Sequence, residues 1–272
     1  MLNLGSSAEL NLHRTLNCGQ CFRWQQESEE HFYGVACGKA AHVWTEQSEV
    51  LLESSDEDSV FWRRYFGLEL DYQTVIRNFR ADAILQKCIA KGYGIRILRQ
   101  DVWETIISFI CSANNNIPRI EKILQTLCTL YGEKIEWQGY DLYTFPSPQI
   151  LAKLTLNDLS PLRAGYRDKY ILGAARMIAD NEIDFLQMQT LATSQLRKEL
   201  CRIPGVGPKV ADCIMLFGMG RYDVFPKDVW TKRILQEIYQ IENGREDRFV
   251  TETFGQYAGI AQQYLYYYFR EF

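Results

Sequence analysis

Two periods of hydrophobic positions divide the chain. Residues 20–52 hold short runs of aromatic and β-branched residues separated by acidic or glycine-containing turns, which is typical of antiparallel strands. From about residue 56, apolar residues recur every three or four positions, as Val60, Phe61 and Tyr65 do, which indicates amphipathic helices. We therefore expect an α+β fold that is mostly α, with a small N-terminal antiparallel sheet and helices throughout the rest.

Start and stop signals place several of these helices. Asp101 precedes an apolar run and has Glu104 three positions later, which predicts a capping box. Pro118 suits the first position of the next helix, and Gly132 suits its end. Asn114, Asn115 and Asn116 fall between these two helices. Further helices are expected at 166–180, 193–202, 208–219, 228–240 and 256–270.

No repeat, low-complexity tract or flexible linker interrupts the sequence. We expect an N-terminal α/β domain at 1–85 and a helical domain at 86–272, which itself forms two subdomains. Because nothing resembles a linker between them, the two domains are expected to pack together.

Composition and charge limit the function classes. The 272 residues are 47% hydrophobic and 24% charged, close to the average for soluble globular proteins. No apolar run reaches the roughly 18 residues of a membrane span, and the N-terminus lacks a secretory signal, so we expect a cytoplasmic protein without membrane contact. A net charge of −4 argues against a broad polyanion-binding surface, so any nucleic-acid site must be local.

The cysteines are expected to be reduced thiols. There are eight, and without an export signal disulfides are not favoured. Cys18 and Cys21 have the spacing of half a zinc site, but no second pair follows, and His13, His31 and His42 are the three histidines. No cysteine follows Cys213, which excludes an iron–sulfur cluster near the C-terminus.

The segment from Leu200 to Leu235 carries the most informative pattern. A helix stops at Pro204, a tight turn uses Gly205 and Gly207, and Pro208 suits the start of a second helix. This predicts a helix-hairpin-helix at about 193–219. The free N–H groups of Gly205, Gly207 and Val210 would bind a DNA phosphate at the helix N-terminus. Between residues 202 and 233, six basic residues stand against three acidic ones, which supplies the local positive charge.

Two residues of this segment suggest chemistry. Lys209 falls in the first turn of the second helix, where the helix dipole and partial burial would lower the pKa of its amine and make it a nucleophile. Asp228 precedes a helical run and is an obvious N-cap. Taken singly, Lys209 could be a solvated surface lysine and Asp228 only a cap. Together they would set an amine and a carboxylate around one reaction centre.

At this point the residues resemble a family. The hairpin, Lys209 and Asp228 are similar to the helix-hairpin-helix (HhH-GPD) DNA glycosylase superfamily, and the whole chain resembles its bifunctional 8-oxoguanine DNA glycosylases. The likeness implies a TBP-like N-terminal antiparallel domain joined to two helical subdomains. Besides the hairpin, it rests on CGQCFRW (18–24), FICSANNNIPRI (109–120), TFPSPQIL (144–151), GYRDKY (165–170) and YAGIAQ (257–262), in that order.

The resemblance implies a reaction. The amine of Lys209 would attack C1′ of the damaged nucleotide while Asp228 stabilises the positive character of the sugar. The resulting Schiff base would allow strand cleavage by β-elimination, which is an abasic-site lyase activity. No cofactor and no metal are required for this chemistry. In the family, hairpin carbonyls can hold a structural cation, which here would involve those of Cys201, Ile203 and Val206.

The resemblance also implies a pocket for a flipped base. The carbonyl of Gly19 would accept the N7–H that 8-oxoguanine has and guanine lacks. Gln262 would contact the Watson–Crick edge, and Cys213 and Tyr266 would sandwich the base, with Tyr in place of the usual Phe. From the residues alone, Gly19 could be a simple turn, Gln262 a surface glutamine and Tyr266 a core aromatic.

A second implied group meets the orphaned base. Asn114, Arg119, Tyr166 and Arg167 match positions that fill the gap, and two guanidinium groups present only donors, which suits cytosine. The alternatives are a helix C-cap for the asparagines and a solvated helix charge for Arg167. Trp230 stands where the family has a phosphate-contacting histidine, and its indole N–H can donate one hydrogen bond.

Three other functions stay open at this stage. A monofunctional alkylated-base glycosylase would use Asp228 alone, so the presence of Lys209 counts against it. Endonuclease III or an adenine glycosylase would need the missing C-terminal cysteines. A noncatalytic DNA-binding module would need only the hairpin. We expect a monomer that acts on double-stranded DNA containing 8-oxoguanine, associated with the nucleoid in a bacterium or located in the nucleus of a eukaryote.

Overall fold

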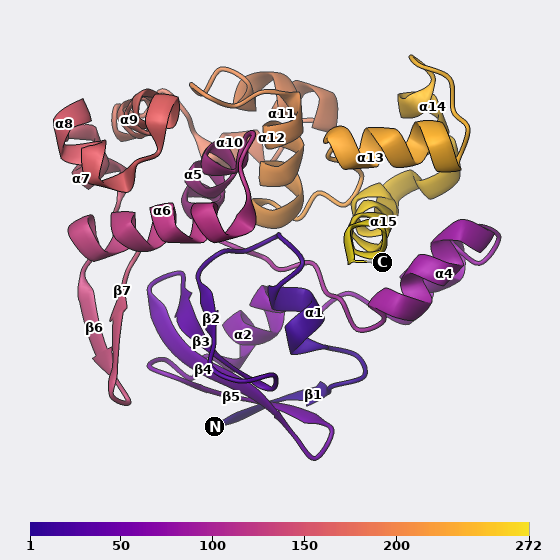
Figure 1. Cartoon of the computed structure of the whole chain (residues 1–272), viewed down its shortest axis with the longest axis horizontal. Coiled ribbons are helices and arrows are strands. Elements are labelled where there is room, and N and C mark those ends of the chain that lie inside the picture. The colour runs from indigo at the N-terminus through magenta and orange to yellow at the C-terminus, as the bar shows by residue number, and fades with distance from the viewer. Residues whose placement is uncertain (272) are drawn as a thin grey trace.

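A computed structural model describes residues 1–271 and shows an N-terminal antiparallel sheet below a larger helical part (Figure 1). This confirms the expected α+β fold. The sheet has the strand order β1-β5-β4-β3-β2. Its strands are β1 (Leu2–Ser6), β2 (Trp24–Gln26), β3 (His31–Ala36), β4 (Lys39–Glu46) and β5 (Glu49–Ser54).

One face of this sheet carries the N-terminal core. The register places Phe32, Val43 and Leu52 opposite one another on three adjacent strands, and all three are fully buried. This alternation is what a half-buried strand requires. Helix α2 (Ser59–Tyr65) contributes the fully buried Trp62, whose ring meets that of Trp24 edge to face. The short helix α1 (Leu12–Leu16) precedes the segment that contains Gly19.

Two strand elements lie outside the expected sheet. Strand β1 pairs with β5 although the pattern placed the sheet within residues 20–52. The expectation that the chain is helical after residue 56 is also wrong, because β6 (Lys134–Trp137) and β7 (Tyr140–Tyr143) form a hairpin. Gln138 and Gly139 both have positive φ there, as a two-residue hairpin turn demands. The hairpin reaches down to the sheet, where the rings of Tyr33 and Tyr140 stack.

The helical part follows the expected periodicity. Two of its segments close with π-helical turns, Ile214–Gly218 after α12 and Ile234–Ile238 after α13, and 3₁₀ turns cover Ser160–Leu162, Gly165–Arg167 and Gly255–Tyr257. No helix among residues 1–271 is long and apolar enough to span a membrane. The remaining helices are α3 (Tyr72–Asn78), α4 (Ala83–Gly92), α5 (Val102–Ser112), α6 (Ile117–Tyr131), α7 (Pro148–Ala152), α8 (Leu156–Leu159), α9 (Asp168–Ala179), α10 (Phe185–Met188), α11 (Thr193–Leu200), α12 (Pro208–Cys213), α13 (Val229–Arg233), α14 (Glu246–Phe254) and α15 (Ala258–Glu271).

Helix α5 lies in the centre of the helical part and is buried on most of its surface. Asp101 caps it, since its Oδ1 accepts the Glu104 N–H at 2.8 Å. The expected capping box does not close, because the Glu104 carboxylate pairs instead with Arg23 at 2.9 Å. This half-buried pair joins α5 to the residue immediately before β2. The predicted division between residues 85 and 86 falls within α4, which packs beside α15.

Candidate active site

The predicted hairpin connects α11 to α12. Gly205 has a φ of +84°, and a Cβ there would lie 2.8 Å from the Tyr170 side chain, so the turn requires glycine. Gly207 is the N-cap of α12 and Pro208 opens the helix. Among residues 1–271, the N–H groups of Gly205, Gly207 and Val210 donate no hydrogen bond. These three donors therefore remain available to an anion.

Lys209 projects from the second helix of the hairpin and is half-buried. Its Nζ lies 5.3 Å from the centre of the Phe109 ring, and Cys213 follows one turn later on the same helix. Burial alone would lower the pKa of the amine. The interactions with Cys213, Asp228 and Tyr266 outweigh burial, so the pKa of Lys209 is raised. The expected lowering is therefore wrong for the free protein, because it left out these neighbours.

Asp228 is the N-cap of α13, as expected. Its Oδ1 accepts the Thr231 N–H at 2.8 Å, and its own N–H donates to the Thr231 hydroxyl at 2.9 Å. This reciprocal pair fixes the carboxylate at the start of the helix. Within residues 1–271, no ion pair of 4.0 Å or less joins Asp228 to Lys209. Instead the two side chains reach the same cavity from two different helices.

That cavity gathers the predicted residues from four separate segments. It has a volume of about 50 Å³. A site that encloses a small ligand usually measures roughly 300–1,000 Å³, so the cavity has to widen before a purine base can enter. Its lining includes all six residues expected to catalyse or to hold the base, which are Gly19, Lys209, Cys213, Asp228, Gln262 and Tyr266.

The polar groups of the cavity suit a ligand. Gln262 is only 5% exposed, so it is not a surface glutamine, and its Oε1 is a buried acceptor without a partner among residues 1–271. A buried unpaired acceptor is costly unless a ligand supplies the donor. Burial raises the pKa of Cys213 to about 11, although the Lys209 charge opposes the rise, so the thiol is neutral at physiological pH. Tyr266 is half-buried on the same helix as Gln262.

Sequence reasoning missed five further residues of the lining. Phe109, Phe217 and Pro226 supply apolar walls, and Cys18 flanks Gly19. The fifth is Gln263, whose Nε2 donates to the Cys18 carbonyl at 3.0 Å. Phe109 and Cys18 stand inside the segments that carried the resemblance, so they could have been proposed. Gln263 gave no separate signal because it directly follows Gln262.

The residues expected to meet the orphaned base form a second group. Asn114 is exposed and has a φ of +50° in the turn between α5 and α6. Tyr166 is 52% exposed and its hydroxyl donates to the Ala113 carbonyl at 3.3 Å. Arg119 is exposed, with Nη2 donating to the Arg163 carbonyl at 3.2 Å. These three side chains leave polar atoms at the surface.

Arg167 differs from the rest of this group. It is only 5% exposed, so it is not a solvated helix charge. Its Nη1 donates to the Ala164 carbonyl and its Nη2 to the Asn114 carbonyl, both at 3.0 Å. Its guanidinium also lies over the Tyr166 ring at 4.6 Å. In the free protein Arg167 therefore holds the turn on which Asn114 stands.

Trp230 lies at the start of α13, two residues after Asp228, and is 49% exposed. Its neighbour Val229 is more exposed still. Two large exposed side chains next to a catalytic candidate are consistent with a surface that a ligand covers.

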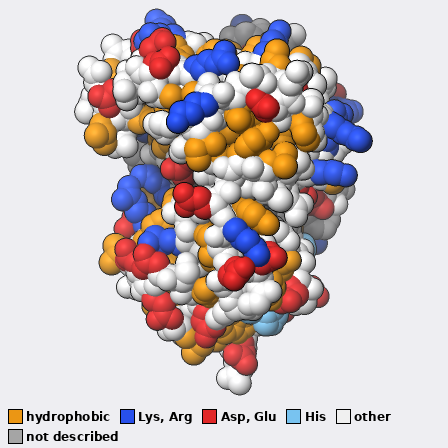
Figure 2. All heavy atoms as spheres, turned by 90° about the vertical axis from the view of Figure 1, so that its left-hand side faces the viewer, with side chains coloured by type: hydrophobic (Ala, Val, Ile, Leu, Met, Phe, Trp, Pro, Cys, Tyr) orange, Lys and Arg blue, Asp and Glu red, His pale blue; other side chains and the backbone are white. Residues whose placement is uncertain are grey.

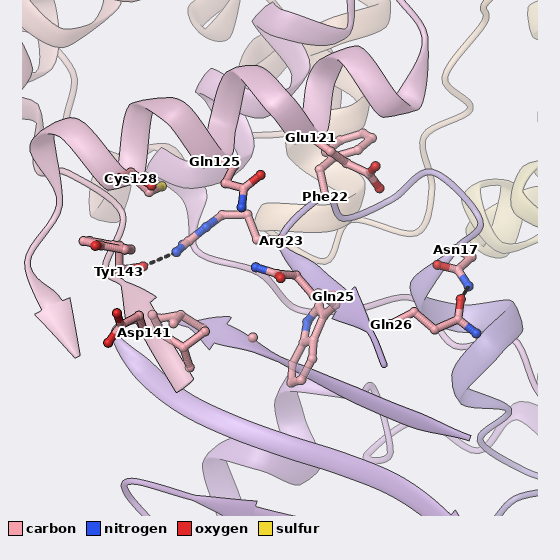
Figure 3. A pocket seen from close by; sticks show the side chains of 15 residues that line it. Asn17, Phe22, Arg23, Gln25, Gln26, Glu121, Gln125, Cys128, Asp141 and Tyr143 are labelled. Carbon is pink, nitrogen blue, oxygen red and sulfur yellow. Dashed lines mark hydrogen bonds between the residues drawn. The ribbon is translucent and has the colours of Figure 1, made fainter. Parts of the chain in front are cut away.

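A larger cavity lies elsewhere. It measures about 410 Å³ between β2, β3, α6 and β7, and Figure 3 shows Gln25 and Gln125 pointing into it and Arg23 hydrogen-bonded to Tyr143. None of the predicted site residues lines it. Volume alone would pass over the small cavity, but the reactive groups select it. All eight cysteines are free thiols, and Cys18 and Cys21 are buried.

Charge is distributed unevenly over the surface. Figure 2 shows Lys and Arg side chains spread over the upper, helical part of one face, whereas Asp and Glu are numerous on the lower, sheet part. This agrees with a net negative chain that has local basic regions.

Comparisons with known proteins agree with this geometry. Residues 3–106 match the model of the 8-oxoguanine DNA glycosylase N-terminal domain, and residues 107–257 match the HhH-GPD superfamily of base excision DNA repair proteins. The N-glycosylase/DNA lyase of Saccharomyces cerevisiae is 32% identical over 267 residues, which cover 87% of this chain and 70% of the yeast protein.

Solved structures give the same result. The 8-oxoguanine glycosylase/lyase of Clostridium acetobutylicum, in complex with DNA containing cytosine opposite 8-oxoguanine, has a TM-score of 0.91 and 36% identity, with 97% of this chain and 92% of that chain covered. The 3-methyladenine DNA glycosylase of Archaeoglobus fulgidus has a TM-score of 0.79 at 20% identity, with 98% and 96% covered. The last likeness shows a shared fold only.

Proposed function

The chain belongs to the HhH-GPD superfamily of base excision DNA repair proteins and carries the N-terminal domain of 8-oxoguanine DNA glycosylases, and on this premise we propose that it removes 8-oxoguanine from duplex DNA and then cleaves the abasic site. One observation carries the proposal. The amine of Lys209 and the carboxylate of Asp228 reach a single cavity whose other polar lining includes Gly19 and Gln262.

The reaction uses two side chains. The neutral amine of Lys209 attacks C1′, the N-glycosidic bond breaks, and the damaged base leaves with the bonding electrons and takes up a proton. Asp228 stabilises the positive character that develops on the sugar. Ring opening then gives a Schiff base between Lys209 and C1′. Loss of a proton from C2′ expels the 3′ phosphate by β-elimination, and hydrolysis of the imine frees the enzyme.

Lys209 must lose a proton before it attacks. Its raised pKa means that the free enzyme holds an ammonium group at neutral pH. Entry of the base would displace water from the cavity and bring an uncharged ring between Cys213 and Tyr266, which disfavours the ammonium form. We infer that binding of the lesion, rather than the free fold, produces the nucleophile.

Recognition of the lesion follows from donors and acceptors. The carbonyl of Gly19 accepts the N7–H of 8-oxoguanine, and the amide of Gln262 offers both an acceptor and a donor to the Watson–Crick edge. Undamaged guanine presents a lone pair at N7 and would repel the Gly19 carbonyl. The neutral thiol of Cys213 and the ring of Tyr266 stack on the two faces of the base.

The exposed group reads the other strand. Arg119 reads cytosine with guanidinium donors, while Asn114 and Tyr166 fill the space that the flipped base leaves. Arg167 contributes by fixing the turn of Asn114 and, once DNA is bound, by facing cytosine. Because arginine has donors only, it matches the acceptors of cytosine better than the exocyclic donor of adenine.

The helix-hairpin-helix and Trp230 bind the DNA backbone. The N–H groups of Gly205, Gly207 and Val210 bind one phosphate, and the indole N–H of Trp230 donates to another. The carbonyls of Cys201 and Val206 suit a structural cation, whereas that of Ile203 already accepts the Val206 N–H at 3.0 Å. The catalytic steps themselves need no cofactor, since amine and carboxylate supply both functions. We expect a monomer that acts where genomic DNA is located.

An excision panel tests the proposal. Single-turnover rates are measured on duplexes with 8-oxoguanine, undamaged guanine or an alkylated purine, each placed opposite cytosine and opposite adenine. We expect excision of 8-oxoguanine, fastest opposite cytosine, followed by strand cleavage. Excision confined to the alkylated purine, without strand cleavage, would instead support the monofunctional alternative. Tight binding without any excision would support a DNA-binding module.

A further inference from the structure

A cluster on the N-terminal sheet has the geometry of a metal site. The register pairs His31 with Trp44 and Tyr33 with His42, so the two histidines are diagonal neighbours on one face of β3 and β4. Nδ1 of His31 and Nε2 of His42 are 3.1 Å apart. Glu27, in the turn before β3, brings a carboxylate oxygen to within 4.8 Å of a ring nitrogen of each histidine.

We propose that Glu27, His31 and His42 bind a divalent transition-metal ion such as Zn²⁺ or Ni²⁺. Two ligand atoms at 2.0–2.1 Å from a tetrahedral ion lie about 3.3 Å apart, close to the observed separation of the two imidazole nitrogens. Two imidazoles and one carboxylate are a donor set that these ions accept, with water in the remaining position.

Neighbouring groups hold the ligands in place. The hydroxyl of Tyr140, at the tip of the β6–β7 hairpin, donates to Glu27 Oε1 at 3.0 Å, and the Trp44 ring stacks on both histidines. Such outer contacts orient metal ligands. The Glu27 N–H also donates to the His31 carbonyl at 2.9 Å, which fixes the turn. A bound ion would link β3, β4 and this turn, and through Tyr140 the hairpin of the helical part.

Calorimetric titration of the full chain tests the site. The protein is stripped with EDTA, dialysed and titrated with ZnCl₂ or NiCl₂ at pH 7.5, and thermal unfolding is recorded in parallel. We expect one ion per chain and a Tm rise of about 5 °C or more at 100 times the Kd. His42→Gln and His31→Gln should weaken binding at least tenfold, and Glu27→Gln by a smaller factor.

Matched variants separate this site from other ligands. His13→Gln and Glu29→Gln change the same residue types outside the cluster, and Cys37→Ser removes an exposed thiol. All three should bind like the wild type. Absence of heat and of any Tm change with both metals would overturn the proposal. So would binding that survives His42→Gln or disappears in Cys37→Ser.

A second inference concerns the loop of Gly19 and rests on the proposed function. The carbonyls on either side of Gly19 are all occupied by glutamine or arginine side chains. Gln263 donates to the Cys18 carbonyl at 3.0 Å, Gln100 to the Gln20 carbonyl at 2.7 Å, and Arg270 to the Asn17 carbonyl at 3.2 Å. The Gly19 carbonyl accepts none of the hydrogen bonds found among residues 1–271.

We infer that Gln263 is a positioning residue for lesion recognition. Its hydrogen bond fixes the peptide immediately before Gly19, and that of Gln100 fixes the carbonyl of the following residue, Gln20. Both bonds leave the Gly19 carbonyl as the acceptor free for N7–H. Because Gln263 is 3% exposed and one residue from Gln262, helix α15 controls both the hydrogen-bonding edge of the pocket and the loop that faces it.

The test separates recognition from chemistry. Gln263→Met keeps the length of the side chain but removes the donor, so we expect excision of 8-oxoguanine to slow at least tenfold. Cleavage of a preformed abasic site, which has no base to recognise, should change less than twofold. Gln256→Met, an exposed change near the start of α15, is the control and should resemble the wild type.

Two results would overturn the role of Gln263. One is unchanged excision by Gln263→Met, and the other is an equal loss of excision and abasic-site cleavage, which indicates general damage to the site. Gln100→Met tests the other flank independently and should show the same selective loss. If the wild-type protein itself fails to excise 8-oxoguanine, the proposed function fails instead, and the two failures are distinguishable.

Discussion

The pocket for the damaged base and the surface expected to contact the opposite base, which we call the partner-reading surface, are built in opposite ways. The pocket is lined by residues from five separate segments, and its polar side chains are buried or half-buried. The partner-reading surface consists of Asn114, Arg119 and Tyr166, which are exposed and stand on one turn or beside it. Catalysis that depends on charge requires an enclosed pocket, because hydrogen-bond donors and acceptors stabilise charge most strongly where water is excluded.

Arg167 marks the boundary between the two regions. It belongs to the partner-reading group by sequence, but it is buried, and its guanidinium serves the backbone of Ala113 and Asn114. The comparison shows that an arginine in this region can either stabilise the backbone of the turn, as Arg167 does, or remain exposed to contact the opposite base, as we propose for Arg119. The predictions below separate these roles, beginning with the largest expected effect.

Lys209→Gln should abolish excision. Glutamine keeps a polar side chain over the Phe109 ring but cannot form an imine, so the single-turnover rate should fall by at least about 10⁴-fold. DNA affinity, measured by fluorescence anisotropy, should change little, because the hairpin N–H groups remain. A variant that keeps a rate within tenfold of the wild type would show that Lys209 is not the nucleophile.

Asp228→Asn should slow the chemical step by about 10²- to 10³-fold. Asparagine is as good an N-cap as aspartate, so the hydrogen bond to the Thr231 N–H can persist and Tm should hardly change. A slower single-turnover rate with an unchanged Tm would therefore show the effect of the carboxylate charge separately from that of the N-cap. An unchanged rate would reduce Asp228 to a cap.

Excision should accelerate with pH. The raised pKa of Lys209 keeps the amine protonated through neutral pH, so the neutral fraction grows about tenfold per pH unit below that pKa. We expect the logarithm of the rate at sub-saturating enzyme, which reports the free enzyme, to rise with a slope near one between pH 6 and pH 9, and the rate at saturating enzyme to depend less on pH, because lesion binding favours the neutral amine. A sub-saturating rate that is flat from pH 7 upwards would contradict the raised pKa of the free amine.

Arg119→Ala and Arg167→Ala should differ. Arg119 is exposed, so its loss should narrow the preference for cytosine over adenine by about 1–3 kcal/mol, or roughly 5- to 150-fold, without a change in stability. Loss of Arg167 leaves the Asn114 and Ala164 carbonyls without their donor, so it should also lower the free energy of unfolding by about 1–3 kcal/mol.

Rates against all four opposite bases and urea unfolding curves measure both effects. Equal losses against every base would show that the arginines hold only the backbone. If Arg167→Ala is as stable as the wild type, its contacts with the turn contribute nothing to the fold.

Trp230→Ala should have the smallest effect. One hydrogen bond to a phosphate is worth about 1 kcal/mol, so DNA affinity should fall about fivefold while the rate at saturating enzyme stays the same. Trp230→His tests the chemistry of the position, since a histidine can also donate. A large loss of rate in Trp230→Ala would place the indole in the catalytic step.

The sequence predicted local structure well where a single residue type decides it. The glycine and proline positions of the hairpin, the caps Asp101 and Asp228, and the period of the helices are all such features. The β6–β7 hairpin was missed although Gln138 and Gly139 suit its turn, because the surrounding helices dominated the pattern.

What could not be predicted depends on neighbours that are distant in sequence. The pKa of Lys209 is raised by Cys213, Asp228 and Tyr266, whereas the helix dipole and partial burial alone predicted that it would be lowered. The burial of Arg167 and the contact from Gln263 to Cys18 join segments 53 and 245 residues apart. Only the tertiary structure brings these groups together.

Mapping the covalent adduct tests the central claim most directly. The wild-type protein is mixed with an 8-oxoguanine·cytosine duplex in the presence of borohydride, which reduces the Schiff base to a stable amine. The trapped complex is digested with nuclease and protease, and the modified peptide is sequenced by mass spectrometry. We predict a single adduct on the Lys209 side chain. An adduct on any other lysine or on the N-terminal amine, or no adduct while 8-oxoguanine is excised, would contradict the account.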